Sequence, residues 1–261
     1  MPWPRWPSLQ AHFEPPPVAD PLWRRALAGC ALARRLDPDR QLQLRRLTAW
    51  FLARKQFHAL AGVVLDDYWR VLIAVQACLP ALQQGTGSLR GWRDVLVYPG
   101  EFRLGRSHQD SHLGAVSECA RLLGGDTGVH GPLVLSLADV QMDLEQPWDG
   151  YNVVLHEMAH KLDMLDGPAD GIPPLVEISR RRWIEQFQLA YQRLLDAPAH
   201  GGDCPIDRYA AHGLCEYFAV VSELHYSQPA TLRQAEPAIA GLLTTFYGRS
   251  PADGGEPGRG R

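Results

Sequence analysis

The sequence predicts an α+β domain in which helices dominate and a small β-sheet precedes a central helix. Three observations lead to this class. Most of the chain spaces its apolar residues three and four positions apart, which is typical of amphipathic helices. Two short β-branched or aromatic runs, bounded by Gly and Pro, are typical of strands. With 46% hydrophobic and 21% charged residues in 261, the chain can bury a sizeable core.

The elements follow in order along the chain. Segments 21–36 and 38–55 place Leu, Ala, Trp and Phe on one face and arginines on the other, which predicts two helices. Segment 66–85 is a third helix and is strongly apolar. The runs in 94–102 and 131–140 are the two expected strands. The second half returns to helical spacing in 151–165, 178–195, 213–226 and 237–247.

One domain is expected between two loose ends. Residues 1–19 hold many of the prolines and show no helical period. Residues 249–261 are Gly, Pro and charge with little to bury, which predicts a disordered tail. The predicted domain therefore spans residues 20–248.

Charge and cysteine usage limit the classes of function. The formal net charge is −3, which is too weak a field to attract nucleic acid or an anionic membrane surface. The longest apolar stretch is too short for a bilayer span, and prolines interrupt the N-terminus where a signal peptide would be apolar. Five widely spaced cysteines without a C-x-x-C pair favour a reduced, cytoplasmic protein. Only two of the 26 basic residues are lysines, Lys55 and Lys161, and the sequence alone gives them no functional weight.

The strongest chemical signal is the motif H-E-x-x-H formed by His156, Glu157 and His160. On a helix, positions i and i+4 share one face, so both imidazoles can meet one metal ion. Glu157 is turned about 100° away from His156, which suits a carboxylate that contacts a metal-bound water. Because the surrounding helix is apolar, burying these polar groups without a partner would be costly. The motif therefore predicts a metal site.

A catalytic zinc site needs a third protein ligand and one open position, and three candidates compete. Asp166 lies ten residues after His156, but the corresponding turn requires a glycine where this chain has Asp163. Glu177 lies beside a Pro-Pro loop at a helix start, where capping explains it. Glu216 lies inside an amphipathic helical run among aromatic and β-branched neighbours. A carboxylate there needs a cation, so Glu216 is the preferred candidate.

Three further residues are candidates for supporting roles. Tyr209, seven residues before Glu216, is either a packing residue or a phenol that donates to an oxyanion. Asp163 lies two helical turns after His156 on the same face, so it either accepts a hydrogen bond from a ligand imidazole or pairs with a nearby arginine. His212 lies one turn before Glu216, where it supports a ligand, contacts substrate or is simply exposed.

Several motifs together resemble the Mlc titration factor A family of bacterial zinc metallopeptidases. The segments that carry the resemblance are RVLIAVQACL, VLVYPGEF, VVLHEMAHKLDMLDG, GIPPL, IDRYAAH and CEYFAVVSE. They match in order over about residues 21–248. One departure is His212-Gly213-Leu214, where the family pattern has a Thr-Asp-Pro-Ala-like stretch. This departure affects the expected rim of the substrate site and leaves the chemical residues in place.

The resemblance implies a fold similar to the catalytic domain of the lethal-factor toxins, which are gluzincins. It also implies that His156, His160 and Glu216 bind one Zn²⁺ per chain, that Glu157 is the general base, and that Tyr209 supports the oxyanion. Family members are described as peptidases of aminopeptidase type and as partners of the transcriptional repressor Mlc. The expected function is peptide hydrolysis, together with regulation of sugar uptake through Mlc. The alternative is a repressor-binding protein whose zinc site is weak or structural.

Overall fold

The computed structural model describes residues 15–100, 131–197 and 204–253. The first part contains α1 (Asp20–Gly29), α2 (Ala31–Arg34), α3 (Pro38–Arg54), β1 (Gln56–Ala59), α4 (Asp67–Cys78), the 3₁₀ helix η1 (Gly85–Leu89) and β2 (Asp94–Tyr98). The second contains β3 (Leu133–Ser136), α6 (Leu137–Glu145), α7 (Val153–Asp163) and α8 (Arg180–Asp196). The third contains η2 (Arg208–His212), α9 (Leu214–Ser227), α10 (Pro229–Ala235), α11 (Pro237–Tyr247) and η3 (Pro251–Asp253).

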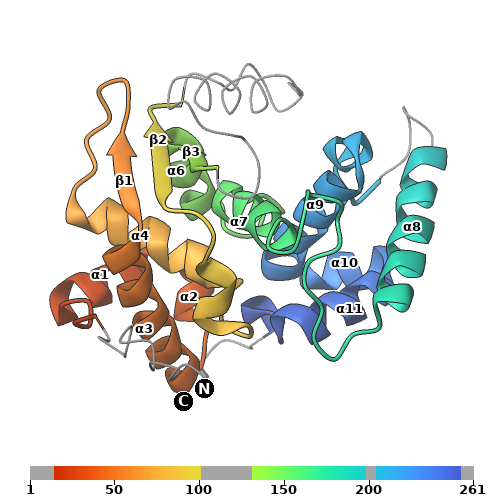
Figure 1. Cartoon of the computed structure of the whole chain (residues 1–261), viewed down its shortest axis with the longest axis horizontal. Helices are drawn as coiled ribbons and strands as arrows, with labels where there is room; N and C mark the ends of the chain where they lie inside the picture. Colours follow the sequence, from red (N-terminus) through yellow and green to blue (C-terminus); the bar gives the residue numbers. More distant parts are fainter. Residues whose placement is uncertain (1–14, 101–130, 198–203, 254–261) are drawn as a thin grey trace, which may run out of the picture.

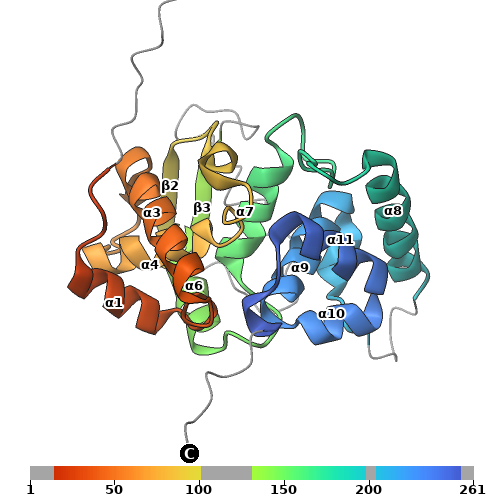
Figure 2. The same ribbon diagram turned by 90° about the horizontal axis from the view of Figure 1, so that it is seen from below.

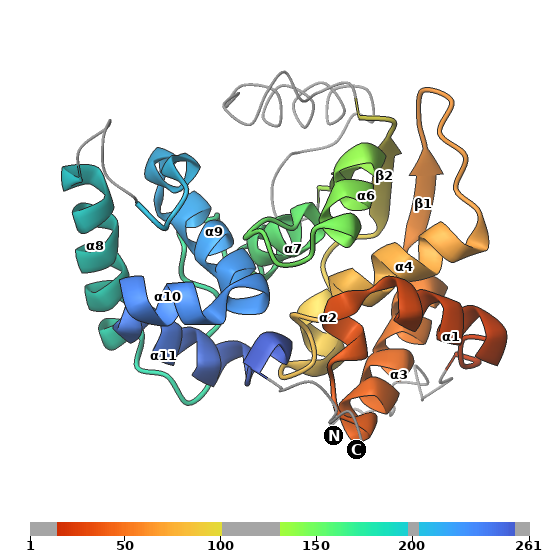
Figure 3. The ribbon, with the colours of Figure 1, turned by 180° about the vertical axis from the view of Figure 1, so that it is seen from behind.

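The elements form two groups of helices with α7 between them. In Figure 1, α1, α3, α4 and the sheet lie on one side, and α8 to α11 lie on the other. The same division is seen from below and from behind (Figures 2 and 3). Helix α7 packs against β3, α4 and α6 on the first side and against α9 on the second. Its side chains can therefore meet groups from both halves of the chain.

The sheet is parallel, with the order β1-β2-β3, and confirms the predicted α+β class. The short strand β1 has no counterpart in the sequence prediction. The predicted strand 94–102 ends at Tyr98, and residues 101 and 102 lie outside the described residues. The predicted strand 131–140 was too long, because Ser136 ends β3 and its side chain caps α6 by accepting from the Asp139 backbone N–H at 3.2 Å. The apolar spacing of this segment continues without a break, so only the cap marks the boundary.

Several helices are preceded by a residue whose side chain caps the first turn. Asp37 accepts from the Arg40 N–H and Asp66 from the Trp69 N–H, each at 2.9 Å. Asn152 caps α7 by accepting from the Leu155 N–H at 2.9 Å. Each cap satisfies a backbone donor that has no partner within its helix.

Three helix predictions differ from the structure. The predicted helix 66–85 is too long, because α4 ends at Cys78. The predicted helix 21–36 is divided into α1 and α2 at Cys30, whose φ of −111° and ψ of 102° are extended. The short helix α10 was not predicted and begins with Pro229 in its first turn, a position where proline costs no hydrogen bond.

The folded part also extends beyond both predicted domain boundaries. Val18 is buried, and the Nε of Arg45 donates to its carbonyl oxygen at 3.2 Å. At the other end, Ser250 and Pro251 are buried and η3 packs against α9 and α2. Residues 249–253 of the predicted disordered tail 249–261 are therefore part of the described fold, and the rest of that prediction lies outside the described residues. No helix in the described part of the chain combines the length and apolarity needed to cross a bilayer.

Gly171 marks a close crossing between the loop after α7 and the start of α9. Its φ is +79°, and a Cβ at this position would lie 2.7 Å from the carbonyl oxygen of Leu214. Its N–H donates to Asp163 at 2.8 Å, and its carbonyl oxygen accepts from the indole N–H of the buried Trp183 at 2.9 Å. Glycine is required here because both the backbone conformation and the close approach exclude a side chain.

The two lysines are both buried beside Trp92. The Nζ of Lys55 donates to the carbonyl oxygens of Leu89 and Trp92, each at 2.6 Å, and lies 3.4 Å from the centre of the Trp92 ring. The Nζ of Lys161 donates to the carbonyl oxygen of Gly131 at 2.7 Å and lies 5.7 Å from the same ring. Burial lowers the pKa of Lys55 to about 7 and that of Lys161 to about 8. Hydrogen bonds to backbone carbonyl oxygens and contacts with the Trp92 ring therefore hold both lysines in place. Their rarity in the sequence did not indicate this role.

Candidate metal centre

Helix α7 presents both histidines of the H-E-x-x-H motif on one face. The Nε2 atoms of His156 and His160 lie 3.2 Å apart, and their ring centres are 4.9 Å apart. Asn152 begins the helix just before the motif, so the first histidine falls in its first full turn. The i, i+4 spacing thus brings two imidazole nitrogens to one point, as the sequence predicted.

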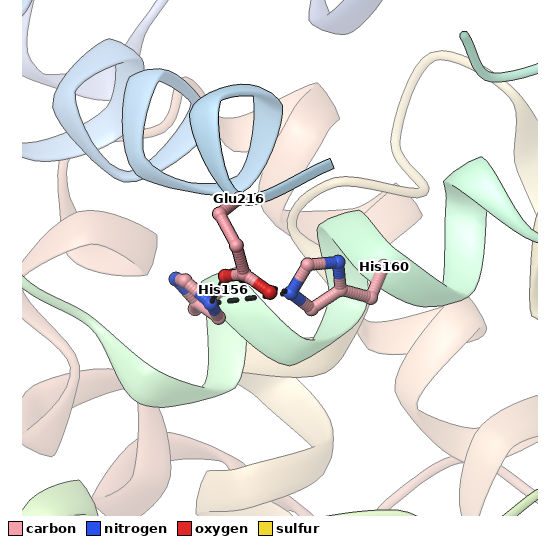
Figure 4. Close-up of side chains that lie close together, drawn as sticks. All are labelled: His156, His160 and Glu216. Carbon is pink, nitrogen blue, oxygen red and sulfur yellow. Dashed lines mark hydrogen bonds and ion pairs between the residues drawn. The ribbon is translucent and has the colours of Figure 1, made fainter. Parts of the chain in front are cut away.

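Helix α9 adds Glu216 to the two histidines. The Oε2 of Glu216 lies 3.2 Å from the Nε2 of His156 and 3.4 Å from the Nε2 of His160. Figure 4 shows the carboxylate extending from α9 toward the two imidazoles on α7. The three ligand atoms lie within 4.8 Å of one another. Two imidazoles and one carboxylate are the donor set of a catalytic zinc site, so these residues fit such an ion.

The charges around the cluster also suit a cation. Burial alone would raise the pKa of Glu216, but its hydrogen bonds with His156 and His160 hold that pKa well below the usual range. Burial alone would lower the pKa of His156, but the charges of Glu223 and Glu216 hold it well above 6.5. Glu216 therefore stays ionised and offers a metal ion a negatively charged oxygen.

Glu223 contacts His156 from the side opposite Glu216 and was missed by the sequence analysis. Its Oε1 lies 2.7 Å from the Nδ1 of His156, and its Oε2 accepts from the Asn152 N–H at 2.5 Å. The available signal was its spacing, because position i+7 lies two turns from Glu216 on the same helix face. A second carboxylate on the face of a predicted ligand was a candidate for supporting the site.

Glu157 and Tyr209 lie beside the three converging groups. Glu157 is half-buried on α7 and is not one of the three groups that converge. The ring centre of Tyr209, in η2, lies 5.9 Å from that of His156. Burial, together with the charges of Glu216 and Glu157, raises the pKa of Tyr209 well above its usual value. The phenol therefore keeps its proton and remains able to donate a hydrogen bond.

Asp207 holds the segment that carries Tyr209. Its Oδ1 accepts from the Tyr209 N–H at 2.7 Å, and its Oδ2 accepts from the hydroxyl of Tyr151 at 2.5 Å. Tyr151 directly precedes the cap of α7. These bonds tie η2 to the start of the histidine-bearing helix.

The side chain of Asp163 bonds to the backbone of the loop after α7. Its two oxygens accept from the backbone N–H groups of Gly171 and Ile172, each at 2.8 Å, and burial raises its pKa to about 6. The hydrogen bond to a ligand imidazole that was considered for Asp163 is made by Glu223 instead. The same backbone donors take the place of the arginine that was the alternative partner of Asp163.

His212 is exposed and lies beside Tyr209. Its Nδ1 is 2.8 Å from the carbonyl oxygen of Tyr209, and the two ring centres are 5.2 Å apart. It is therefore a neighbour of Tyr209 and is not one of the three converging groups.

The two competing third ligands lie elsewhere. Asp166 is 46% exposed and its Oδ2 is 3.9 Å from Arg180. Glu177 is exposed, with a φ of +64°. Neither belongs to the His156, His160 and Glu216 group, which is the cluster of this kind found among the described residues. Of the three candidates, only Glu216 lies where a third ligand is needed.

Comparison with known proteins agrees with this geometry. Residues 5–248 match the family described as glucose-regulated metallo-peptidase M90. The chain is 33% identical to Mlc titration factor A of Cronobacter sakazakii over 250 residues, covering 95% of this chain and 92% of that protein. It is 35% identical to Mlc titration factor A of Klebsiella pneumoniae over 234 residues, covering 88% and 86%. An uncharacterised protein of Synechocystis is 32% identical over 253 residues, covering 95% and 90%. The chain therefore belongs to the M90 family of metallopeptidases.

Proposed function

We propose that this protein is a zinc-dependent peptidase of the gluzincin type. The observation that carries the proposal is the convergence of His156 and His160 from α7 with Glu216 from α9. Zinc held by these residues would polarise the scissile carbonyl and lower the pKa of a bound water. The membership in a metallopeptidase family supports the same assignment.

The neighbouring side chains supply the remaining chemistry. Glu157 is the general base, because it lies next to His156 on α7 without joining the three converging groups. It takes the proton from the attacking water and gives it to the leaving amine. Tyr209 donates its phenolic hydrogen to the oxyanion, since its raised pKa keeps that hydrogen in place.

The substrate is a peptide, and cleavage is of the aminopeptidase type. Strand β3 packs against α7 and, among the described strands, pairs only with β2. This supports pairing of an extended substrate backbone with the other edge of β3. We also place the protein in the cytoplasm, where the free thiols of Cys30, Cys78, Cys204 and Cys215 fit a reducing environment.

The test combines metal analysis with a panel of aminoacyl reporters and internally cleavable peptides. Wild-type protein should contain about one zinc per chain and hydrolyse the aminoacyl reporters. Glu157→Gln should keep the zinc and lose hydrolysis by two or more orders of magnitude, about the contribution of a general base. Glu185→Gln, on the exposed surface of α8, should match wild type in both measurements. Loss of zinc from Glu157→Gln, or full activity in it, would refute the assigned role.

The name of the relatives supports a second role, binding of the repressor Mlc. We propose that binding and hydrolysis are separate properties of the chain. Glu157→Gln should then still retain purified Mlc in a pull-down while it fails to cleave the reporters. If wild type binds Mlc and zinc but cleaves nothing in the panel, the repressor-binding alternative with a structural zinc replaces the peptidase.

A further inference from the structure

Glu223 is a buried carboxylate of α9 that contacts His156 and the start of α7 together. Its residue exposure is 5%, so two protein groups take the place of solvent around its oxygens. One oxygen lies 2.7 Å from the Nδ1 of His156, and the other accepts from the Asn152 N–H at 2.5 Å. Because an ionised carboxylate can only accept, the Nδ1 of His156 must carry the hydrogen.

We propose that Glu223 is a positioning residue that fixes both the orientation of His156 and the nitrogen that it offers to a metal. The terminal torsion of histidine is broad and roughly two-fold, so an imidazole ring can present either nitrogen unless a neighbour prevents it. With Nδ1 held by Glu223, the Nε2 of His156 is directed toward Glu216 and His160. This inference rests on the proposed metal site.

The position of Glu223 is itself set by a buried network. Asn152 donates its backbone N–H to Glu223, accepts from the Leu155 N–H at 2.9 Å, and donates through Nδ2 to the Oε1 of Gln76 at 2.9 Å. Helices α4, α7 and α9 therefore meet at this one residue. The carboxylate of Glu223 cannot shift without breaking its bonds to His156 and to Asn152, and Asn152 is itself fixed by its bonds to Leu155 and Gln76, so Glu223 can hold the imidazole in one place.

The two histidines differ in this respect. Within the described residues, His156 has a carboxylate on Nδ1, whereas His160 contacts His156 and Glu216 through Nε2. Loss of Glu223 should therefore release one ligand and leave the other in place. Zinc would then be held weakly, because one of its three protein ligands would be free to rotate.

Asp143 provides the control that separates a purely structural role of Glu223 from a positioning role. The Oδ2 of Asp143, on α6, accepts from the Val153 N–H at 2.6 Å, one residue beyond the N–H that Glu223 accepts. Both carboxylates are buried and both stabilise the positive end of the α7 dipole. Glu223 also touches the imidazole of His156, whereas Asp143 bonds to the backbone of Val153. Asp143→Asn is therefore the matched control for Glu223→Gln.

The experiment measures the zinc affinity of both variants by competition with a chelator, and their urea unfolding in the metal-free state. Glutamine keeps the size of Glu223, but its NH₂ group must face one of the two donors. Both variants should lose some stability, since each weakens a cap of α7. Glu223→Gln should also bind zinc 10- to 100-fold more weakly than wild type, the usual effect of a partner behind a metal ligand. Asp143→Asn should stay within about 3-fold of wild type, because the hydrogen bond that Asp143 accepts from the Val153 N–H does not involve a metal ligand.

Crystal structures of the metal-free variants provide a readout that does not depend on zinc. In Glu223→Gln the ring of His156 should rotate away from Glu216, while Asp143→Asn should keep the wild-type ring. The proposal is overturned if the ring stays in place in Glu223→Gln, or if both variants lose zinc affinity equally. Failure of wild-type protein to bind zinc would instead refute the proposed function, and the ring orientation would still decide the role of Glu223.

Discussion

Replacing Gly171 with alanine should disturb the position of Glu216 from a distance. The new Cβ would lie 2.7 Å from the carbonyl oxygen and 2.9 Å from the carbonyl carbon of Leu214, the first residue of α9. Both are backbone atoms, so no flexible side chain can move aside. Relief of the contact must shift the loop or the start of α9, and Glu216 lies only two residues further on.

The expected cost comes from two sources. Alanine at a φ of +79° adopts the left-handed conformation, which costs about 1–2 kcal/mol. Forcing a methyl group into a close-packed contact typically costs about 1–3 kcal/mol more. The free energy of unfolding should therefore fall by about 2–5 kcal/mol. For a chain of this size that corresponds to a drop in Tm of about 4–20 °C.

The assay is thermal unfolding of metal-free protein, followed by a chelator competition for zinc. Gly167→Ala is the matched control, because Gly167 lies in the same loop and a Cβ there would meet nothing within 4 Å. Gly171→Ala should unfold at the lower temperature and bind zinc more weakly than the control. Equal Tm values for the two variants would show that the contact with Leu214 is not as close as described, and the reasoning would fail.

Three further changes test the site and the core. Glu216→Ala should weaken zinc binding by more than the 10- to 100-fold of an indirect partner, while Asp166→Ala should leave it unchanged; the reverse order in a chelator competition would exclude Glu216 as a ligand. Tyr209→Phe keeps the ring beside His156 and should lower kcat about 10²- to 10³-fold with zinc content unchanged, and full activity on the aminoacyl reporters would remove its oxyanion role. Lys55 has its pKa lowered by burial from 10.5 to about 7, so the folded chain holds fewer protons than the unfolded chain between these values. In urea unfolding, wild type should therefore gain stability relative to Lys55→Met as the pH rises from 7 toward 10, and a constant difference would contradict the lowered pKa.

The parts of the fold that the sequence predicted well are those with a strong local signal. Helix α7 was expected at 151–165 and runs from Val153 to Asp163, and α11 was expected at its observed bounds. The apolar period identifies such helices because each packs one face on the core. Strand β1 was missed because its four residues, Gln56–Ala59, are too few and too mixed in polarity to show alternation.

The candidate site was partly accessible from the sequence for the same reason. The spacing of His156 and His160 fixes their geometry on any helix. Glu216 was preferred because a carboxylate among apolar neighbours needs a cation. Glu223, which bonds to the Nδ1 of His156, could not be identified in this way. Whether Asp163 or Glu223 reaches the imidazole depends on how α7 and α9 pack, and helical spacing alone does not determine that packing.

The site lies on two helices that are far apart in the chain, since 60 residues separate His156 from Glu216. A metal ion bound by both helices would act as a reversible cross-link between them and would be lost when they separate. Binding that occurs only in the folded state adds about 2.7 kcal/mol to stability when the free metal concentration is 100 times Kd. The supply of metal in the cell would then determine how long the chain stays folded as well as whether its site is filled, and a metal-starved cell would degrade the protein sooner.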